Sequence, residues 1–290
     1  MPKAIDFRVA VPAQYYATKE DLERAYKGYL STYMTLYGDN MEFLEHTVDS
    51  MIQNAKEADI EYCVLQGEWE FGSCDKLNDE VYRIATENPD MFPYYFMAIN
   101  PGDNHNIANY IEENVRERGF AGVNIQGFST GLAINDRTWT PVYSKCQELG
   151  IPVAIHSSIN FATTRSLSVD RPIDISDVAA AFPDLLIVAN HGGWPWVAEL
   201  VAVAWKHPNV YIDIGAQMPK YIAKPGTGWE PLLVHGNSTI QDKVLFASDS
   251  MLPQKELIQQ MYDALPLKDS VREKWLYKNA EALLDRIKRY

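Results

Sequence analysis

Eight short apolar segments rich in β-branched residues recur along the 290-residue chain, and stretches with helical spacing of apolar residues separate them. We predict strands at 4–11, 61–67, 94–100, 122–128, 152–158, 185–193, 209–216 and 243–250. Most are apolar on both faces, which is typical of strands in a parallel sheet that helices cover. Eight strands alternating with helices predict an α/β fold, a (β/α)8 TIM-type barrel. The alternative, a doubly wound open sheet, would carry a glycine-rich turn after the first strand, and residues 9–12 (VAVP) do not resemble one.

The segments between the predicted strands carry apolar residues three and four positions apart, as amphipathic helices do. We predict helices at 19–37, 41–58, 137–149, 174–182, 195–206, 254–265 and 271–287. Gly150 and Pro183 lie where two of these helices should end. No break in composition marks a second domain. We therefore expect a single domain over 1–290, in which 19–58 forms an N-terminal helical insertion or lid plus the first barrel helix.

The charge and cysteine content exclude several classes of partner. Lys and Arg number 26 against 39 Asp and Glu, and a net charge of −13 argues against nucleic acid, whose phosphates need cationic side chains. The three cysteines form no C-x-x-C pair, which fits a reducing compartment. No apolar run approaches the ~18 residues of a membrane span, and no phosphate-binding loop is present. We expect a cytoplasmic protein without membrane, nucleic acid or nucleotide cofactor.

Polar residues at the ends of the predicted strands mark a candidate site. In a barrel of this kind the active site lies at the carboxyl ends of the strands. His156 ends the fifth strand, His191 lies at the end of the sixth, and Asp249 at the end of the eighth. Arg8 lies in the first strand, and Asp213 in the seventh. We expect these side chains to converge at one face of the barrel.

Several ordered motifs resemble those of the amidohydrolase-2 family, the branch that includes aminocarboxymuconate semialdehyde decarboxylase and related carboxy-lyases and hydrolases. The motifs are IPVAIH at 151–156, FPDL at 182–185, ANHGG at 189–193, PNVYID at 208–213 and LFASD at 245–249. The resemblance covers nearly the whole chain and implies a distorted (β/α)8 barrel. It also implies that His156 is a metal ligand, that His191 is a catalytic base, and that Asp249 is a ligand or base. Because members are often dimers, it further implies a homodimer.

The first predicted strand departs from the family pattern, which has Asp-x-His-x-His there. Residues 6–10 read DFRVA, so Arg8 and Ala10 stand at the two positions that would ligate metal. His156 and Asp249 remain, whereas a catalytic zinc normally takes three protein ligands. The fixed charge of a guanidinium also repels a cation. We therefore expect no metal cofactor; the alternative is one divalent metal, Zn or Mn, weakly held by His156 and Asp249.

These residues suggest chemistry that needs no metal. Arg8 can bind a substrate carboxylate or polarise a carbonyl, and Asp249 or His191 can activate water as a general base. His156 can donate to the developing oxyanion. We expect a hydrolase that opens the ester or lactone of a small carboxylated, aromatic or cyclic substrate. The alternative is a carboxy-lyase of the same family. The second alternative is a catalytically silent barrel that binds a small molecule or a protein, in which Arg8 and Asp249 neutralise each other as a buried salt bridge.

Loop residues near the predicted mouth supply candidates for substrate binding. Arg165 and Arg171 follow the fifth strand and could bind an anionic group, or they could be solvated loop charges. Trp194 follows the double glycine after His191 and could line the pocket. Residues 66–72 (QGEWEFG) are rich in carboxylate and aromatic groups, and they fit either a pocket wall or an ordinary loop.

Overall fold

Eight parallel strands form a barrel in the computed structural model, which describes residues 3–27, 46–103, 106–250 and 253–290. The strands are β1 (Ala4–Ala10), β2 (Ile60–Gln66), β3 (Tyr94–Ala98), β4 (Gly122–Ile125), β5 (Val153–His156), β6 (Ile187–Asn190), β7 (Val210–Asp213) and β8 (Val244–Leu245). Each pairs in parallel with the next along the chain. The Phe7 N–H donates to the Phe246 carbonyl at 2.9 Å and joins the last strand to the first. The predicted (β/α)8 TIM-type barrel is confirmed.

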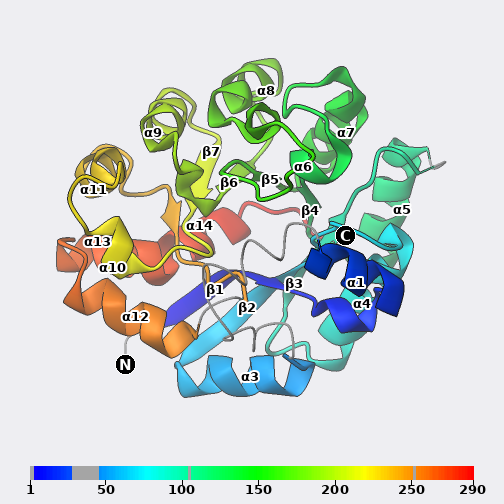
Figure 1. The fold of residues 1–290 in the computed structure, drawn as a ribbon, viewed down its shortest axis with the longest axis horizontal. Helices are drawn as coiled ribbons and strands as arrows, with labels where there is room; N and C mark the ends of the chain where they lie inside the picture. The colour runs from blue at the N-terminus through cyan, green and yellow to red at the C-terminus, as the bar shows by residue number, and fades with distance from the viewer. Residues whose placement is uncertain (1–2, 28–45, 104–105, 251–252) are drawn as a thin grey trace.

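Helices surround the strands on the outer side of the barrel (Figure 1). The longer ones are α1 (Lys19–Lys27), α3 (Val48–Glu57), α4 (Cys74–Glu87), α5 (Ile107–Arg118), α7 (Thr140–Leu149), α8 (Ile175–Ala181), α9 (Val197–Lys206), α11 (Glu230–Gly236) and α12 (Gln254–Asp263). The shorter ones are α6 (Gly127–Thr130), α10 (Pro219–Ile222), α13 (Asp269–Glu273) and α14 (Asn279–Leu284). No helix of the described ranges is both long and apolar enough to cross a membrane.

The helix ends follow from local sequence. Thr47 and Ser50 form a capping box at the start of α3, in which each side chain accepts from the backbone N–H of the other residue. Gly150 ends α7 with a φ of 66°, a left-handed conformation that glycine adopts without steric penalty. The C-terminal stop predicted at Gly150 is thus confirmed.

The N-terminal helical region agrees with the prediction only where the structure describes it. The predicted helix 19–37 begins as α1, and Leu22 of α1 lines the cavity at the mouth of the barrel. The predicted helix 41–58 corresponds to α3, which contacts β2 as the first barrel helix should. The rest of these two predictions, residues 28–45, lies outside the described residues, so the insertion or lid stays a prediction.

The predicted helix 271–287 differs from the observed structure. It is divided into α13, a π-helical turn (Lys274–Lys278) and α14. Trp275 in that turn is fully buried, and its indole N–H donates to the Gly236 carbonyl at 3.1 Å. A π-helical turn contains one extra residue, and the helix buries the same face on both sides of that turn. The spacing of apolar residues therefore does not reveal it.

Strand β1 places polar side chains inside the barrel. Side chains alternate between the two faces of a strand, so Asp6 and Arg8 share one face and Ile5, Phe7 and Val9 share the other. All of these residues are buried. Asp6 accepts hydrogen bonds from the Ser248 N–H at 2.9 Å and from the Gln254 amide at 2.7 Å. The buried carboxyl group of Asp6, at the base of the site, therefore has hydrogen-bond partners for both of its oxygens.

Candidate active site

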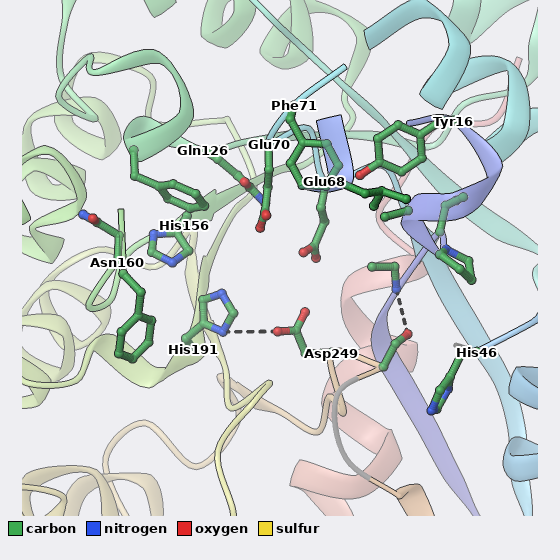
Figure 2. Close-up of a pocket in the computed structure, with 18 of the residues that line it drawn as sticks. Tyr16, His46, Glu68, Glu70, Phe71, Gln126, His156, Asn160, His191 and Asp249 are labelled. Atoms are coloured by element: carbon green, nitrogen blue, oxygen red, sulfur yellow. Dashed lines mark hydrogen bonds and ion pairs between the residues drawn. The ribbon is translucent and has the colours of Figure 1, made fainter. Parts of the chain in front are cut away.

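A cavity of about 150 Å³ lies at the carboxyl ends of the strands, where the sequence predicted the site. His156, His191 and Asp249 all line it, and Figure 2 shows their side chains around a common space with Glu68 and Glu70. Strands β5, β6 and β8 bring the first three together from positions far apart in the sequence. The predicted convergence of these three residues is thus observed.

Arg8 lies beside this cavity at the centre of a buried cluster of charges. Its Nη1 lies 2.7 Å from Glu68 and 3.0 Å from Asp249, and its Nε lies 3.2 Å from Asp213. Burial lowers the pKa of the guanidinium, but Asp213, Asp249 and Glu68 outweigh burial and hold the pKa above its ordinary value. Arg8 is therefore a permanent cation that three acidic side chains share.

The prediction that Arg8 binds a substrate carboxylate is not supported by this placement. The side chain is fully buried and does not line the cavity. Nε and Nη1 face carboxylates, and Nη2 contacts the His191 ring at 2.8 and 3.0 Å. Arg8 instead positions Asp249 and His191, which do reach the cavity. The sequence suggested a buried pair of Arg8 with Asp249 only for the silent barrel. It did not suggest Glu68 as a partner, because a βα loop supplies that residue.

His191 is held as a neutral imidazole. Nη2 of Arg8 lies 2.8 Å from Nδ1 and 3.0 Å from Nε2, and Nδ1 also lies 3.1 Å from the Gly215 carbonyl. Burial, then Arg8 and His156, lower the pKa of His191 well below its usual value. With a guanidinium beside both ring nitrogens, this ring is poorly placed for the predicted role of general base.

Two carboxyl groups that face the cavity retain protons more strongly than usual. Burial raises the pKa of Asp249 well above its ordinary value, although Arg8 opposes the effect. Burial also raises the pKa of Glu70 to about 7, again against Arg8. The charges of Glu68, Asp213 and Glu70 add to the effect on Asp249. Near neutral pH the site therefore holds proton donors as well as acceptors.

His156 has a carboxylate beside one ring nitrogen. Nδ1 lies 3.1 Å from Oδ1 of Asp170, which is fully buried, and Asn160 donates to the other oxygen of Asp170 at 2.7 Å. Phe128 packs edge-on against the His156 ring at 4.8 Å between centroids. These contacts fix the ring at the wall of the cavity. Such a carboxylate–histidine pair can orient an imidazole for proton transfer.

The backbone is strained at three residues that line the cavity. His191 has a φ of 67°, Asp249 a φ of 65° and Ser250 a φ of 56°, all in the left-handed region that residues other than glycine rarely adopt. The Asp249 N–H donates to the Arg8 carbonyl at 2.9 Å, and the His191 N–H donates to Asp213 at 2.9 Å. These hydrogen bonds hold the strained conformation and direct both side chains inward.

The three residues predicted to bind substrate are placed differently from one another. Trp194 lines a second cavity beside the first. Arg165 donates through Nε to the Phe128 carbonyl at 3.1 Å, and Arg171 pairs with Glu199 on the outside of the barrel. Neither arginine lines either cavity. Their predicted role in binding therefore has no support from their placement.

The sequence prediction missed three carboxylates that shape the site. Glu68 and Glu70 come from the loop after β2, for which a pocket wall was only one of two interpretations. Asp170 ends a 3-10 turn (Leu167–Asp170) in the loop after β5 and was not singled out. Their position in the sequence could have indicated their role, since all three lie in loops that follow barrel strands at the active-site face. This indication is weak, because charged residues in loops are usually solvated.

The side chains present do not form a complete metal-ligand set. Within the ranges 3–27, 46–103, 106–250 and 253–290, no three His, Cys, Asp or Glu side chains are grouped to hold a metal ion. The His191 ring and Asp249 both lie against the cation of Arg8.

Comparison with known proteins gives a family and several structures of the same fold. The amidohydrolase family model matches residues 45–286, and no curated protein matches. An uncharacterised TIM-barrel protein from Bordetella bronchiseptica is 28% identical over 98% of this chain and 99% of its own, with a TM-score of 0.80. A 2,6-dihydroxybenzoate decarboxylase in complex with 2,6-dihydroxybenzoate is 16% identical, with coverages of 98% and 99% and a TM-score of 0.69.

A third structure corrects the prediction about the cofactor. The 5-carboxyvanillate decarboxylase of Novosphingobium aromaticivorans is 17% identical over 98% of this chain and 96% of its own, with a TM-score of 0.68, and its crystals contain manganese. The expectation of a protein without metal is contradicted by this finding. That expectation relied on counting ligands in one chain, and such a count omits oxygen ligands from a bound molecule or water.

Proposed function

The chain belongs to the amidohydrolase family, and we propose that this enzyme is a carboxy-lyase that removes the carboxyl group of a small aromatic or cyclic acid. The two decarboxylases of the same fold support a lyase better than they support the hydrolase first predicted from the sequence. Membership of an enzyme family also argues against the silent barrel. The observation that carries the proposal is the placement of the Asp249 carboxyl group at the cavity wall, 3.0 Å from Nη1 of Arg8.

Loss of carbon dioxide from an acid leaves an electron pair on carbon that must take up a proton. Asp249, whose pKa burial raises, can donate that proton to the carbon as the bond to the carboxylate breaks. The products are carbon dioxide and the ring with a hydrogen atom in place of the carboxylate, and Asp249 is left as a carboxylate beside Arg8. Because Nη1 of Arg8 lies 3.0 Å away, the new charge is stabilised at once. Water then returns a proton to Asp249.

The electrostatics of the cavity favour the same reaction. Among the described residues, no Lys or Arg side chain lines the cavity, and Arg8 is closed off from it. A substrate carboxylate there has no permanent cation beside it, and its conversion to neutral carbon dioxide removes an uncompensated charge. Gln126 and His156 on the same wall offer polar groups that could orient the carboxylate before it leaves.

Manganese belongs in the assay because a relative contains it. His156 and Asp249 are the predicted ligands in this chain, and they fall short of the usual number. No step above passes through a metal.

A release assay for carbon dioxide tests the proposal. Hydroxybenzoates are supplied to the wild type and to Asp249→Asn, with and without manganese. We expect turnover by the wild type and a loss of at least about 100-fold in Asp249→Asn, the lower end of the range for general acid catalysis. Asp263→Asn, on the outer face of α12, is the matched control and should retain wild-type turnover. Equal rates for wild type and Asp249→Asn would refute the role of Asp249.

The pair of His156 and Asp170 favours hydrolysis as a second candidate function. With Asp170 at 3.1 Å, the ring could accept a proton from water and direct the water at an ester or lactone. Lactones screened against the wild type and Asp170→Asn separate the two functions. Lactone opening that falls in Asp170→Asn, together with no release of carbon dioxide from any acid, would favour hydrolysis over the lyase.

A further inference from the structure

A second cavity of about 440 Å³ adjoins the catalytic one. We call it the second chamber; it meets the first cavity along a shared wall, and that wall consists of His156, Ile159, Phe161 and His191. The His156 and His191 rings are in edge-to-face contact, with 4.8 Å between their centroids. Because the same four side chains line both cavities, the second chamber lies directly beside the space that Asp249 faces.

The two cavities differ in charge. Glu68, Glu70 and Asp249 line the first. Among the residues that the structure describes, no Asp, Glu, Lys or Arg side chain lines the second chamber. Its walls carry Trp194, Tyr221 and Trp229 instead, with amide and hydroxyl groups between them. Such walls suit an uncharged, flat group, because aromatic rings prefer to pack against other aromatic rings.

The aromatic walls are fixed before any ligand binds. The Trp194 indole N–H donates to the Thr227 carbonyl at 3.0 Å. Trp229 lies so close to Gly192 that a Cβ at that position would come within 2.5 Å of the indole ring. Gly192 also has a φ of 67°, which glycine tolerates. Because Gly192 has no side chain, Trp229 can pack against the backbone next to His191.

A polar group in the second chamber is free to bind a ligand. The side-chain amide of Gln217 lines the chamber and has no hydrogen-bond partner among the described residues. The Thr227 hydroxyl, in contrast, donates to the Lys224 carbonyl at 2.6 Å. Gln217 can therefore recognise an oxygen substituent on a ring bound in the chamber.

We propose that the second chamber is a subsite for an uncharged aromatic group attached to the reacting ring, so that the substrate is a two-ring acid. The inference rests on the proposed function, which places the reacting carboxylate in the first cavity. The sizes support it, because a cavity of about 150 Å³ holds one benzene ring. A single-ring acid would leave the larger chamber, at about 440 Å³, without a ligand.

Binding by calorimetry tests the inference with three probes: salicylate, 4-phenylsalicylate and 5-phenylsalicylate. We expect at least one phenyl isomer to bind the wild type ten times more tightly than salicylate, or better. Gln217→Trp fills the chamber and should reduce that ratio to below two. Trp194→Ala, which removes a wall instead, should also reduce it. Gln259→Trp, on the exposed face of α12, is the matched control and should keep the wild-type ratio.

The outcomes separate the subsite from the proposed function. If salicylate binds and releases carbon dioxide but neither phenyl isomer gains affinity, the subsite is wrong and the lyase stands. If the gain survives in both Gln217→Trp and Trp194→Ala, the phenyl group binds elsewhere and the subsite is wrong. If the gain is present and lost in the variants, yet no acid releases carbon dioxide, the subsite stands and the lyase is wrong. Failure of all three acids to bind contradicts both.

Discussion

Replacing Glu70 with glutamine should change how the stability of the protein depends on pH. Burial raises the pKa of this carboxyl group from 4.5 to about 7 in the folded state. Because the unfolded chain ionises first, raising the pH through this window favours unfolding. At ~1.4 kcal/mol per pKa unit, the shift corresponds to a loss of roughly 3 kcal/mol that is complete above pH 7. Glu70→Gln has no proton to lose and should not show this loss.

Urea unfolding at pH 5 and at pH 8, at constant ionic strength, measures the effect. We expect the free energy of unfolding of the wild type to fall by about 2 to 3 kcal/mol more than that of Glu70→Gln between these two values. Glu117→Gln, at an exposed position on α5, is the control and should follow the wild type. If Glu70→Gln shows the same pH dependence as the wild type, the carboxyl group of Glu70 does not titrate near neutral pH in the folded protein.

Three further predictions concern the buried cation, the metal and the assembly. Arg8→Met should lower the free energy of unfolding at pH 7 by ~3–5 kcal/mol, because Asp213 and Asp249 lose their partner. Arg83→Met, on the surface, is the control and should lower it by less than about 1 kcal/mol. A similar loss in both variants would contradict the buried network. The double variant Arg8→His with Ala10→His should bind manganese at least about tenfold more tightly than the wild type, because it adds two imidazole ligands. Competition with a chelator measures this affinity. Equal affinities would contradict the assignment of positions 8 and 10 as metal-ligating positions. Light scattering should give a homodimer, and a monomeric mass would refute this prediction.

The strands could be predicted from sequence because burial on both faces leaves a strong pattern. The run at 185–193 contains β6, and the run at 152–158 contains β5. The predicted bounds are longer than the observed ones, most of all for 243–250, where only Val244–Leu245 pairs as a strand. The apolar run continues beyond Leu245, since Phe246 remains in the core and its carbonyl accepts from the Phe7 N–H of β1.

The site could be predicted only where it lies on the strands. His156, His191 and Asp249 follow apolar runs, so fold topology alone brings them together. Glu68 and Asp170 lie in loops whose path depends on tertiary contacts, and no periodicity encodes such a path. The pairing of Glu68 with Arg8 then changed the interpretation of Arg8 from a substrate-binding group to a positioning residue.

The left-handed backbone at His191 and Asp249 has a consequence for engineering a more heat-resistant form of this protein. Each of these residues stores on the order of 1 kcal/mol or more of conformational strain, which glycine would release. Selection for folding yield or heat tolerance alone would therefore enrich glycine at both codons and discard the two side chains that face the cavity. Directed evolution should hold positions 191 and 249 constant and seek its gains elsewhere on the barrel.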